Sequence, residues 1–524
     1  MPQRITLRLS PLEADNIKML RAYVANHLCI SQKTITGTKI IRRSLDARKR
    51  PAVYQYVIDV YINEPYPLVT NPILTFNNIY SNKKQVIIIG AGPAGLFAAL
   101  QLINLGIKPI ILERGKDVRS RRRDLALLNK SGIVNPNSNY CFGEGGAGTY
   151  SDGKLYTRSN KRGNILSILQ TFVHFGAPEQ ILYDAHPHIG TNKLPQIITS
   201  MREQILKSGG EIYFNHCVND ILIKENRIVG VEASGFRFIG DAYLLATGHS
   251  ARDIFELLQK KSILIEAKPF ALGVRIEHPQ QLINEIQYHH TFSNLLPPAS
   301  YSLVKQIKDR GMFSFCMCPG GIIAPAATSS GEVVVNGWSP SKRNNPFANS
   351  GIVVEIRHAD IIPLMKGEGI GENDPLIFMR FQQMVEKAAY AAGGGKCKAP
   401  GQRLVDFCKG KESVSLPNHS YIPGLSIANL QTVLPPFVYK TLASGFPLFG
   451  KILKGYYTND AIVVATESRT SSPVKIPRDI KYFHHPHIEN LYPCGEGAGY
   501  AGGIISAAMD GEKVAAAIFS RIGD

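Results

Sequence analysis

A glycine-rich segment, Gly90-Ala91-Gly92-Pro93-Ala94-Gly95, has the clearest chemical meaning in this sequence. It follows an apolar run, Val86 to Ile89, that is typical of a buried parallel strand, and it opens a helical stretch that extends to about Leu105. In this spacing the first glycine permits a tight turn, and the second lets the backbone approach a pyrophosphate. The third lets the helix lie close to the strand. The helix N-terminus then supplies an anion site.

An acidic residue completes this βαβ unit. Lys108 to Leu112 is expected to form the second strand, and Glu113 ends it 23 residues after Gly90. A carboxylate at this point can accept hydrogen bonds from ribose hydroxyls, and it disfavours the 2′-phosphate of NADP. The segment therefore predicts a site for FAD or NAD, and we expect the neighbouring Arg114 to contact the same dinucleotide.

Later segments favour FAD. The loop 142–154 is dense in glycine and small polar residues, and its backbone can press against a flat ring system. A meander of strands, expected at 211–215, 220–224, 228–233 and 242–246, ends in Ala246-Thr247-Gly248. Such an ending returns the chain beside the first strand in two-dinucleotide-domain flavoproteins. The segment 491–500 precedes a helix expected from Gly502 to about Phe519, whose dipole can stabilise negative charge on a reduced flavin.

The predicted cofactor contacts come from all of these segments. Because the sequence contains no second glycine motif on a strand-helix unit, NAD(P)H is expected only as a transient electron donor. The residues predicted to bind FAD are Gly90, Gly92, Pro93, Ala94, Gly95, Glu113, Arg114, Gly145, Gly146, Gly148, Thr149, Ser151, Asp152, Val218, Thr247, Gly248, Gly495, Glu496, Ala498, Gly502, Gly503 and Ile504.

The motifs resemble those of a family of FAD-dependent dehydrogenases (NAD(P)/FAD-dependent oxidoreductases) of bacteria and plastids, within the glutathione reductase and fumarate reductase flavoprotein superfamily. In the last motif Glu496 stands where many relatives carry Asp. The resemblance implies a non-covalently bound FAD and names no substrate. The segments that carry it are 86–100, 143–155, 246–253, 267–279, 313–321, 468–479 and 492–508.

The length of 524 residues predicts two or three domains. We expect a discontinuous α/β, Rossmann-like FAD-binding domain over 85–260 and 460–524, with an inserted α+β substrate domain over 265–455. The inserted segment contains a helical stretch near Pro375 to Ala392. Substrate sites in such folds lie between the two domains, against the flavin.

Residues 1–80 are expected to form a small basic domain with a β-α-β-β pattern, followed by a linker over 63–82. The strands are expected at 5–9, 34–43 and 53–62, with a helical stretch at 11–28. One loop carries Arg42, Arg43, Arg48, Lys49 and Arg50. We favour a solvated hairpin tip or a cover over the pyrophosphate, rather than a nucleic-acid-binding appendage, because no aromatic pair interrupts the basic run.

Composition narrows the partners and the compartment. The net charge of +18 predicts attraction to anions, and thus favours a small anionic substrate. The eight cysteines are scattered, which fits a reducing compartment. The longest uncharged apolar run, 86–100, is shorter than the roughly 20 residues that span a bilayer. Without a signal-peptide pattern, the sequence predicts a cytoplasmic protein with no membrane span. The sequence leaves the oligomeric state open.

Four residues are weak catalytic candidates. His249 follows the Ala-Thr-Gly turn and can relay a proton, although a structural histidine is favoured. Arg469, among hydroxyl residues, is interpreted equally well as a clamp for a carboxylate or phosphate and as a surface ion pair. Cys316 and Cys318 could contact the flavin as a redox or metal pair, but packing as small apolar residues is favoured. The absence of a C-x-x-C pair argues against a dithiol reductase.

The remaining polar groups are weaker candidates for a functional role. Arg275 and Arg403 are weaker versions of the anion clamp. The tract His484-His485-Pro486-His487 is interpreted as an exposed loop, and no metal site is expected. The sequence thus favours an FAD-dependent oxidoreductase. Two alternatives stay open: a flavin-dependent enzyme that modifies RNA such as tRNA, suggested by the basic N-terminus and by the run 119–123, and a non-catalytic flavin-binding redox sensor.

Overall fold

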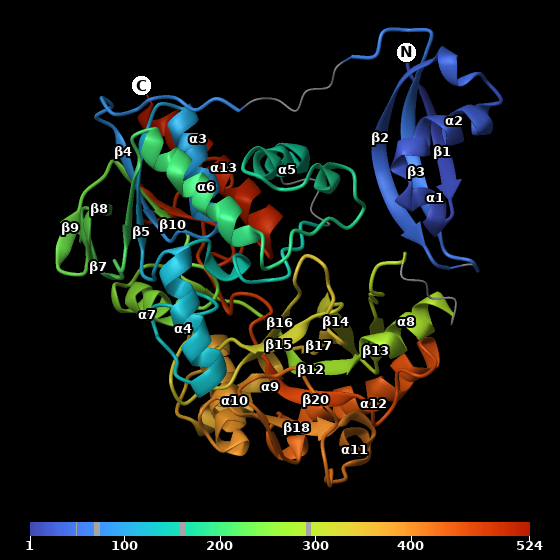
Figure 1. Ribbon diagram of the computed structural model, residues 1–524. Coiled ribbons are helices and arrows are strands. Elements are labelled where there is room, and N and C mark those ends of the chain that lie inside the picture. Colours follow the sequence, from blue (N-terminus) through green and yellow to red (C-terminus); the bar gives the residue numbers. More distant parts are fainter. Residues whose placement is uncertain (49, 68–73, 158–162, 290–294, 524) are drawn as a thin grey trace.

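The computed structural model describes residues 1–48, 50–67, 74–157, 163–289 and 295–523. Figure 1 shows three parts: a small N-terminal unit, a parallel sheet with its helices, and a larger mixed sheet with its own helices. The helices that the sequence patterns predict near the glycine motif and at the C-terminus are both present. None of the helices in the described part of the chain is long and apolar enough to cross a membrane.

The first sheet has five parallel strands in the order β22-β10-β4-β5-β6. Its central strand β4 is buried, as its unbroken Val-Ile-Ile-Ile run requires of a strand covered on both faces. The predicted return of the chain beside the first strand is confirmed, because Leu244 of β10 pairs with Ile88 of β4. The strands are β4 (Gln85–Ile89), β5 (Lys108–Glu113), β6 (Glu211–Phe214), β10 (Ala242–Leu245) and β22 (Leu491–Pro493).

Helices and a small meander complete this α/β unit. The first and last helices, α3 and α13, pack against each other beside the sheet (Figure 1). The helices are α3 (Pro93–Asn104), α4 (Val118–Ser131), α5 (Ile165–His174), α6 (Leu194–Lys207), α7 (Arg252–Lys260) and α13 (Ile504–Ile522). The meander is β7 (Val218–Lys224), β8 (Arg227–Ala233) and β9 (Phe236–Phe238).

The second sheet has seven strands in the order β13-β14-β17-β12-β20-β18-β19. Its strands β12 and β17 are almost wholly buried and form the centre of the largest apolar core. The strands are β12 (Ala271–Pro279), β13 (Val304–Ile307), β14 (Arg310–Cys318), β17 (Phe347–Glu355), β18 (Ala399–Arg403), β19 (Leu425–Ile427) and β20 (Ile462–Glu467). The hairpin β15 (Ile322–Pro325) and β16 (Val335–Trp338) packs beside it.

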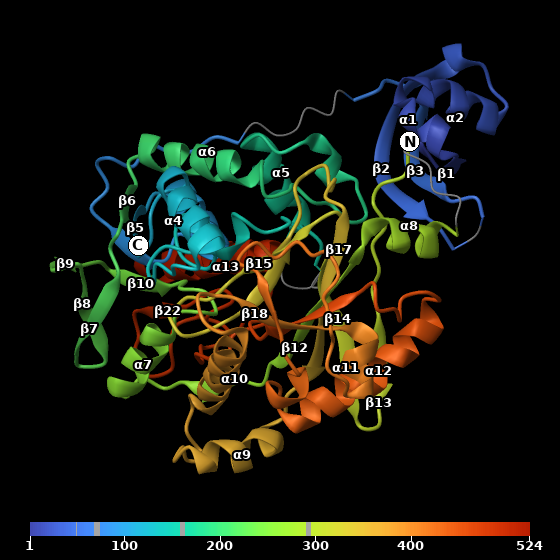
Figure 2. The ribbon, with the colours of Figure 1, turned by 60° about the horizontal axis from the view of Figure 1, so that its bottom comes forward.

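Helices α8 to α12 lie around the second sheet (Figure 2). Helix α12 contacts strands β12, β14 and β17, and α10 contacts β18 and β20. The helix expected near Pro375 to Ala392 is α10. The helices are α8 (Gln280–Tyr288), α9 (His358–Gly367), α10 (Ile377–Gly393), α11 (Leu404–Lys409) and α12 (Pro436–Ile452).

One boundary differs from the prediction. Strand β20 was expected to begin the second part of the FAD-binding domain at 460, but it pairs with β12 and β18 in the second sheet. The chain leaves the first unit at β11 (Glu266–Ala267) and returns at β21 (Val474–Lys475), and these two strands pair with each other. A short apolar run fits the interior of either sheet equally well, so the sequence alone does not assign it.

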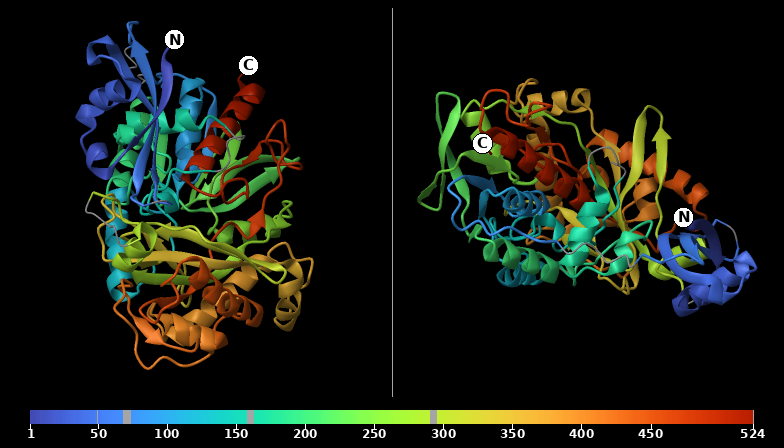
Figure 3. Two further views of the ribbon diagram at one scale, coloured as in Figure 1. Left: turned by 90° about the vertical axis from the view of Figure 1, so that its right-hand side faces the viewer. Right: turned by 90° about the horizontal axis from the view of Figure 1, so that it is seen from above.

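The N-terminal unit is a three-stranded antiparallel sheet in the order β1-β3-β2, with helices on one side (Figure 3). The expected single helix over 11–28 is interrupted at Asn16. The elements are β1 (Gln3–Leu9), α1 (Pro11–Asp15), α2 (Leu20–Leu28), β2 (Ile35–Asp46) and β3 (Val53–Ile62).

Two of the basic residues predicted for its loop pair with carboxylates. Arg43 forms two hydrogen bonds of 2.7 and 2.9 Å with Asp184, and these tie the unit to the rest of the chain. Arg48 pairs with Asp46 at 2.9 Å. Lys49 lies outside the described residues. Carboxylates therefore neutralise Arg43 and Arg48, whereas Arg42 and Arg50 are exposed.

Candidate functional site

A cavity of about 360 Å³ lies at the carboxyl ends of the parallel strands, where α/β sheets bind ligands. One wall comes from the turn between β4 and α3, the end of β5, the glycine-rich loop and the turn after β10. The opposite wall comes from the second sheet and its connections, through Phe315, Cys316, Asn336, Arg469 and Thr470. The site therefore lies between the two larger parts of the fold.

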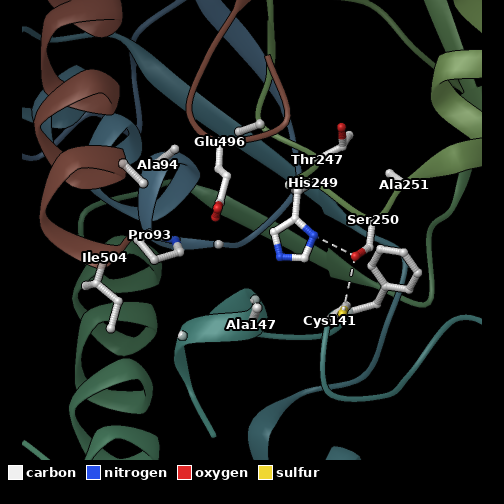
Figure 4. Close-up of a pocket in the computed structure, with 18 of the residues that line it drawn as sticks. Pro93, Ala94, Cys141, Ala147, Thr247, His249, Ser250, Ala251, Glu496 and Ile504 are labelled. Carbon is white, nitrogen blue, oxygen red and sulfur yellow. Dashed lines mark hydrogen bonds between the residues drawn. The ribbon is translucent and has the colours of Figure 1, made fainter. Parts of the chain in front are cut away.

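Helices α3 and α13 both begin at this cavity. Gly92 is the N-cap of α3 and Gly503 is the N-cap of α13, and neither offers a capping side chain to the first backbone N–H groups. The residues that follow, Pro93, Ala94 and Ile504, line the cavity (Figure 4). Helix N-termini with free N–H groups attract anions through both hydrogen bonds and the helix dipole. The pair forms a cradle suited to phosphate oxygens.

The glycines of the first turn have distinct roles. A Cβ at Gly95 would lie 2.1 Å from the carbonyl oxygen of Gly90, so the third glycine lets α3 lie close to β4. A Cβ at Gly92 would meet only the Cα of Gly146, at 4.0 Å, so this position is open toward the cavity. The backbone there is free for close approach by a ligand.

Glu113 organises this turn as well as lining the cavity. Its buried carboxylate accepts hydrogen bonds from the backbone N–H groups of Ala91, Gly115 and Gly143, at 2.8 to 2.9 Å. A carboxylate offers about four lone-pair positions, so some capacity remains for a ribose hydroxyl. The neighbouring Arg114 bonds to Asp253 at 2.9 Å and stacks on Phe142, which fixes its guanidinium at the rim.

Most of the residues predicted from the sequence meet in this one cavity. Those that line it are Gly90, Gly92, Pro93, Ala94, Glu113, Arg114, Gly146, Gly148, Ser151, Asp152, Val218, Thr247, Gly248, Glu496, Gly502, Gly503 and Ile504.

Five predicted residues do not line it: Gly95, Gly145, Thr149, Gly495 and Ala498. These residues support the loops from behind. For example, Thr149 donates its hydroxyl to the carbonyl of Glu144 at 2.8 Å, and the amide of Gly495 donates to Asp510 at 2.8 Å. A glycine-rich motif does not reveal which of its residues face the ligand.

The arginine run 119–123 also has a structural member. Arg121 is fully buried and donates hydrogen bonds to the carbonyl oxygens of Asn139, Tyr140 and Glu144, at 2.8 to 3.0 Å. It therefore holds the start of the glycine-rich loop and is not available to RNA. Arg119, Arg122 and Arg123 are exposed.

His249 points into the cavity, and Glu496 points into it from the neighbouring loop (Figure 4). The Nδ1 atom of His249 lies 2.7 Å from the hydroxyl of Ser250, which in turn lies 3.4 Å from the sulfur of Cys141. Burial, together with the positive charge of Arg469, lowers the pKa of His249 to about 4. The imidazole is therefore neutral near pH 7, so it can donate or accept a hydrogen bond.

Arg469 is neither an open clamp nor a surface ion pair. It lines the cavity, but it is 5% exposed and pairs with Glu386 at 3.0 Å and Glu332 at 3.4 Å. Arg252 joins the same cluster through Glu332 and Glu386, at 3.0 and 2.8 Å. This four-residue ion cluster links helix α10 to the chain that follows β20. Its ion pairs join residues far apart in sequence, which local patterns do not predict.

The structure also corrects three weaker predictions. Arg275 is fully buried and pairs with Glu467 at 2.7 Å. Arg403 donates to the carbonyl oxygens of Ser415 and Asn459, so it braces loops of the second sheet. The histidine tract is not simply an exposed loop, because His485 is buried with its Nε2 atom 3.1 Å from the carbonyl of Leu264.

The two candidate cysteines lie in different environments. Cys316 lines the cavity, whereas Cys318 is buried behind it. Lys154 reaches both sulfurs, at 3.8 and 3.9 Å. Lys154 and Asn336 were not singled out from the sequence. Lys154 lies within the motif 143–155, but only the fold brings it to the cysteines of β14.

Family comparisons agree with this site. Residues 83–138 match an FAD binding domain, and residues 269–470 match the model described as "FAD-dependent protein, C-terminal domain-like". Residues 1–61 match a domain of unknown function. An uncharacterized protein of Clostridium beijerinckii is 38% identical over 526 residues, which covers 97% of each chain.

Solved flavoproteins are much more distant. A mutant of the halogenase PltM in complex with FAD has a TM-score of 0.39 at 11% identity, covering 84% of this chain and 71% of its own. The flavin-dependent brominase Bmp2 has a TM-score of 0.36 at 12% identity, with coverages of 84% and 79%. Glycine oxidase from Bacillus cereus has a TM-score of 0.30 at 14% identity, with coverages of 84% and 96%.

Proposed function

The chain belongs to the family of FAD-dependent proteins that includes the clostridial relative, and we propose that it is an FAD-dependent oxidoreductase acting on a small, anionic substrate. The observation that carries the proposal is the cavity between the two sheets. It joins a dinucleotide cradle to a wall of side chains from the second sheet and its connections, among them Cys316. The strongly positive net charge supports an anionic substrate.

The residues of the cradle fit FAD. The free N–H groups at the start of α3 and α13 would hold the pyrophosphate, and Glu113 would hold the ribose. The glycine-rich loop, through Gly146 and Gly148, would lie against the flavin ring. When bound, the cofactor supplies hydride and electron chemistry, and the protein supplies position and charge.

Side chains of the protein also have roles in the proposed reaction. Neutral His249, held by Ser250, can pass a proton at its Nε2 atom. The ion cluster around Arg469 fixes the wall opposite the cradle. The proposed electron donor is a reduced nicotinamide that enters the cavity transiently.

The proposal is tested by mixing the purified holoprotein anaerobically with NADH and with NADPH and following flavin absorbance by stopped flow. Rapid bleaching by one nucleotide is the expected result. If dithionite reduces the flavin but neither nucleotide bleaches it, the nicotinamide donor is wrong. A flavin that neither nucleotide nor any added small anion reduces or reoxidises would contradict the oxidoreductase assignment and favour a sensor.

The pH dependence of FAD binding is a further prediction. Burial raises the pKa of Glu496 to about 7 from an ordinary value of 4.5, although the positive charge of Lys268 opposes the shift. The neutral carboxyl is compatible with an anionic dinucleotide, whereas the ionised form repels it. We expect the FAD dissociation constant to rise above pH 7, by at most about tenfold per pH unit.

The substitution E496Q removes this ionisation and is expected to give a flat profile. Fluorescence titration of the apoprotein with FAD between pH 6 and pH 9 measures the profiles of the wild type and of E496Q. Glu496 also contributes to folding stability, and this contribution is complete below pH 4.5 and is lost as the pH rises through 7. FAD binding and stability therefore both weaken as the pH rises. A wild-type profile identical to that of E496Q would exclude this role for Glu496.

A further inference from the structure

Strand β14 carries an irregularity at the cavity wall. Phe315 pairs with Gly351 and Cys318 pairs with Asn349, so one extra residue lies between them on β14. Cys316 takes up the extra length with φ +45°, a left-handed conformation that is uncommon for a residue with a side chain. Bulges of this kind re-aim side chains and occur next to active sites. Here the bulge presents Cys316 to the cavity.

Cys316 and Cys318 differ in exposure. The Cys316 side chain lines the cavity, while Cys318 is fully buried and contacts the Cys316 carbonyl oxygen at 3.3 Å. Two residues that are two positions apart have Cα atoms at most about 7 Å apart, near the upper limit for a disulfide. One thiol therefore faces the ligand space, and a second lies within reach behind it.

Positive groups surround the pair. The ammonium of Lys154 lies 3.8 Å from the Cys316 sulfur and 3.9 Å from the Cys318 sulfur. Arg275 donates to the Cys316 carbonyl at 2.7 Å and approaches the Cys318 sulfur at 3.7 Å. These groups favour a thiolate over a thiol at the accessible position.

The negative charges nearby are committed elsewhere. Glu467 pairs with Arg275 at 2.7 Å, and Asp152 pairs with Arg343 at 2.9 Å while lying 4.0 Å from Lys154. A hydrogen bond from Cys318 lowers the pKa of Cys316 well below its ordinary value, and Lys154 and Arg275 lower it further against the effect of burial. The pKa of Cys318 is raised well above its ordinary value because it donates that bond.

From this arrangement we propose that Cys316 and Cys318 form a redox-active dithiol on the cavity wall, with Lys154 as its positioning residue, and that the substrate is a low-molecular-weight disulfide. Cys316 is the attacking thiolate and Cys318 is the resolving thiol. That the dithiol serves the flavin rests on the proposed function, whereas the dithiol itself does not.

The exchange balances within the protein and its substrate. The Cys316 sulfur bonds to one substrate sulfur, the substrate disulfide breaks, and the first product leaves as a thiolate. Cys318 then bonds to the Cys316 sulfur, and its proton goes to the second leaving sulfur. The substrate disulfide gains two electrons, and the protein dithiol becomes a disulfide.

Alkylation of the full-length protein tests the accessible thiolate. Iodoacetamide labelling is followed by peptide mass spectrometry, with the exposed Cys29 as an internal reference. At about pH 6, Cys316 is expected to react at least about tenfold faster than Cys29. K154M should remove most of this advantage and K154R should retain it. Equal rates for Cys316 and Cys29 in the wild type would overturn the proposal without any variant.

Reaction with bis(2-hydroxyethyl) disulfide tests the pair. In the wild type we expect an internal disulfide between Cys316 and Cys318, seen as the loss of two hydrogen atoms from the connecting peptide. C318S should stop at a mixed disulfide on Cys316, and C408S, at a half-buried thiol outside the cavity, should behave as the wild type. Wild-type protein that forms neither species refutes the dithiol.

Flavin content and nicotinamide reduction are measured on the same samples. A protein that keeps a reducible flavin without forming the disulfide refutes only the dithiol. A protein that forms the disulfide but binds no FAD refutes the proposed function. The melting temperature of each variant shows whether a lost reaction reflects a lost fold.

Discussion

Replacing Gly92 by alanine is expected to remove most FAD binding while leaving the apoprotein folded. The backbone at Gly92 has φ −76°, which alanine adopts without strain, and an added Cβ would meet only one atom, 4.0 Å away. That Cβ would, however, stand where a pyrophosphate must approach the backbone. Overpacking of this kind costs about 1–3 kcal/mol, which is roughly 5- to 160-fold in the dissociation constant.

Apoprotein of the wild type and of G92A is titrated with FAD, and the melting temperature of each apoprotein is recorded. The apoprotein melting temperature should stay unchanged or rise slightly, because alanine lowers the entropy of the unfolded chain. G367A is a matched control at a helix end where an added Cβ meets nothing within 4 Å. Equal FAD affinity in G92A and the wild type would exclude the cradle as the pyrophosphate site.

The substitution E386A is expected to be the most destabilising of the changes considered. Glu386 is fully buried and accepts from Arg252 at 2.8 Å, Arg469 at 3.0 Å and Ser468 at 2.6 Å. Its removal leaves two largely buried guanidinium groups with one carboxylate, Glu332, between them. Breaking a buried ion pair in this way costs about 3–5 kcal/mol.

Urea unfolding followed by circular dichroism measures the loss. E266A, which breaks the exposed pair between Glu266 and Lys475, is the control and should cost less than about 1 kcal/mol. A cost for E386A no larger than that of E266A would show that the cluster does not hold the two parts of the chain together.

The same residue predicts an acid dependence. Burial alone would raise the pKa of Glu386, but Arg252 and Arg469 outweigh it and hold the pKa at about 2, against an ordinary value of 4.5. Because the folded pKa is lowered, this stabilisation is complete above 4.5 and is lost as the pH falls through about 2. In the alanine variant this part of the acid dependence should be absent.

The dinucleotide cradle is the part of the fold that the sequence predicts best. Its signals are local: an apolar strand, three spaced glycines, a helix and an acid at the end of the next strand. The returning strand β10 was also predicted, because its Ala-Thr-Gly ending is a local pattern. Gly145 and Thr149 show the limit, since a glycine-rich loop does not reveal which residues face the ligand and which support it.

Most of the wrong predictions concern residues or strands that pair with distant segments of the chain. Arg469 was interpreted equally well as an anion clamp and as a surface ion pair, and Arg275 as a weaker clamp. Glu386 and Glu467 neutralise these two arginines from distant segments. The domain boundary predicted at 460 placed β20 in the FAD-binding domain, because buried strands have the same composition in both sheets. Cys316 was expected in the core with Cys318, because alternation predicts a regular strand and does not predict a bulge. Its contact with Lys154 depends on that bulge.

The central claim is that this cavity holds one non-covalent FAD, and the most direct test is to identify what the purified protein releases. The protein is denatured, the precipitate is removed, and the supernatant is analysed by absorbance and mass spectrometry. The account predicts one FAD per chain in the supernatant and none on the precipitated protein. Apoprotein that releases no flavin and does not quench the fluorescence of added FAD, or that binds FMN instead, would contradict it.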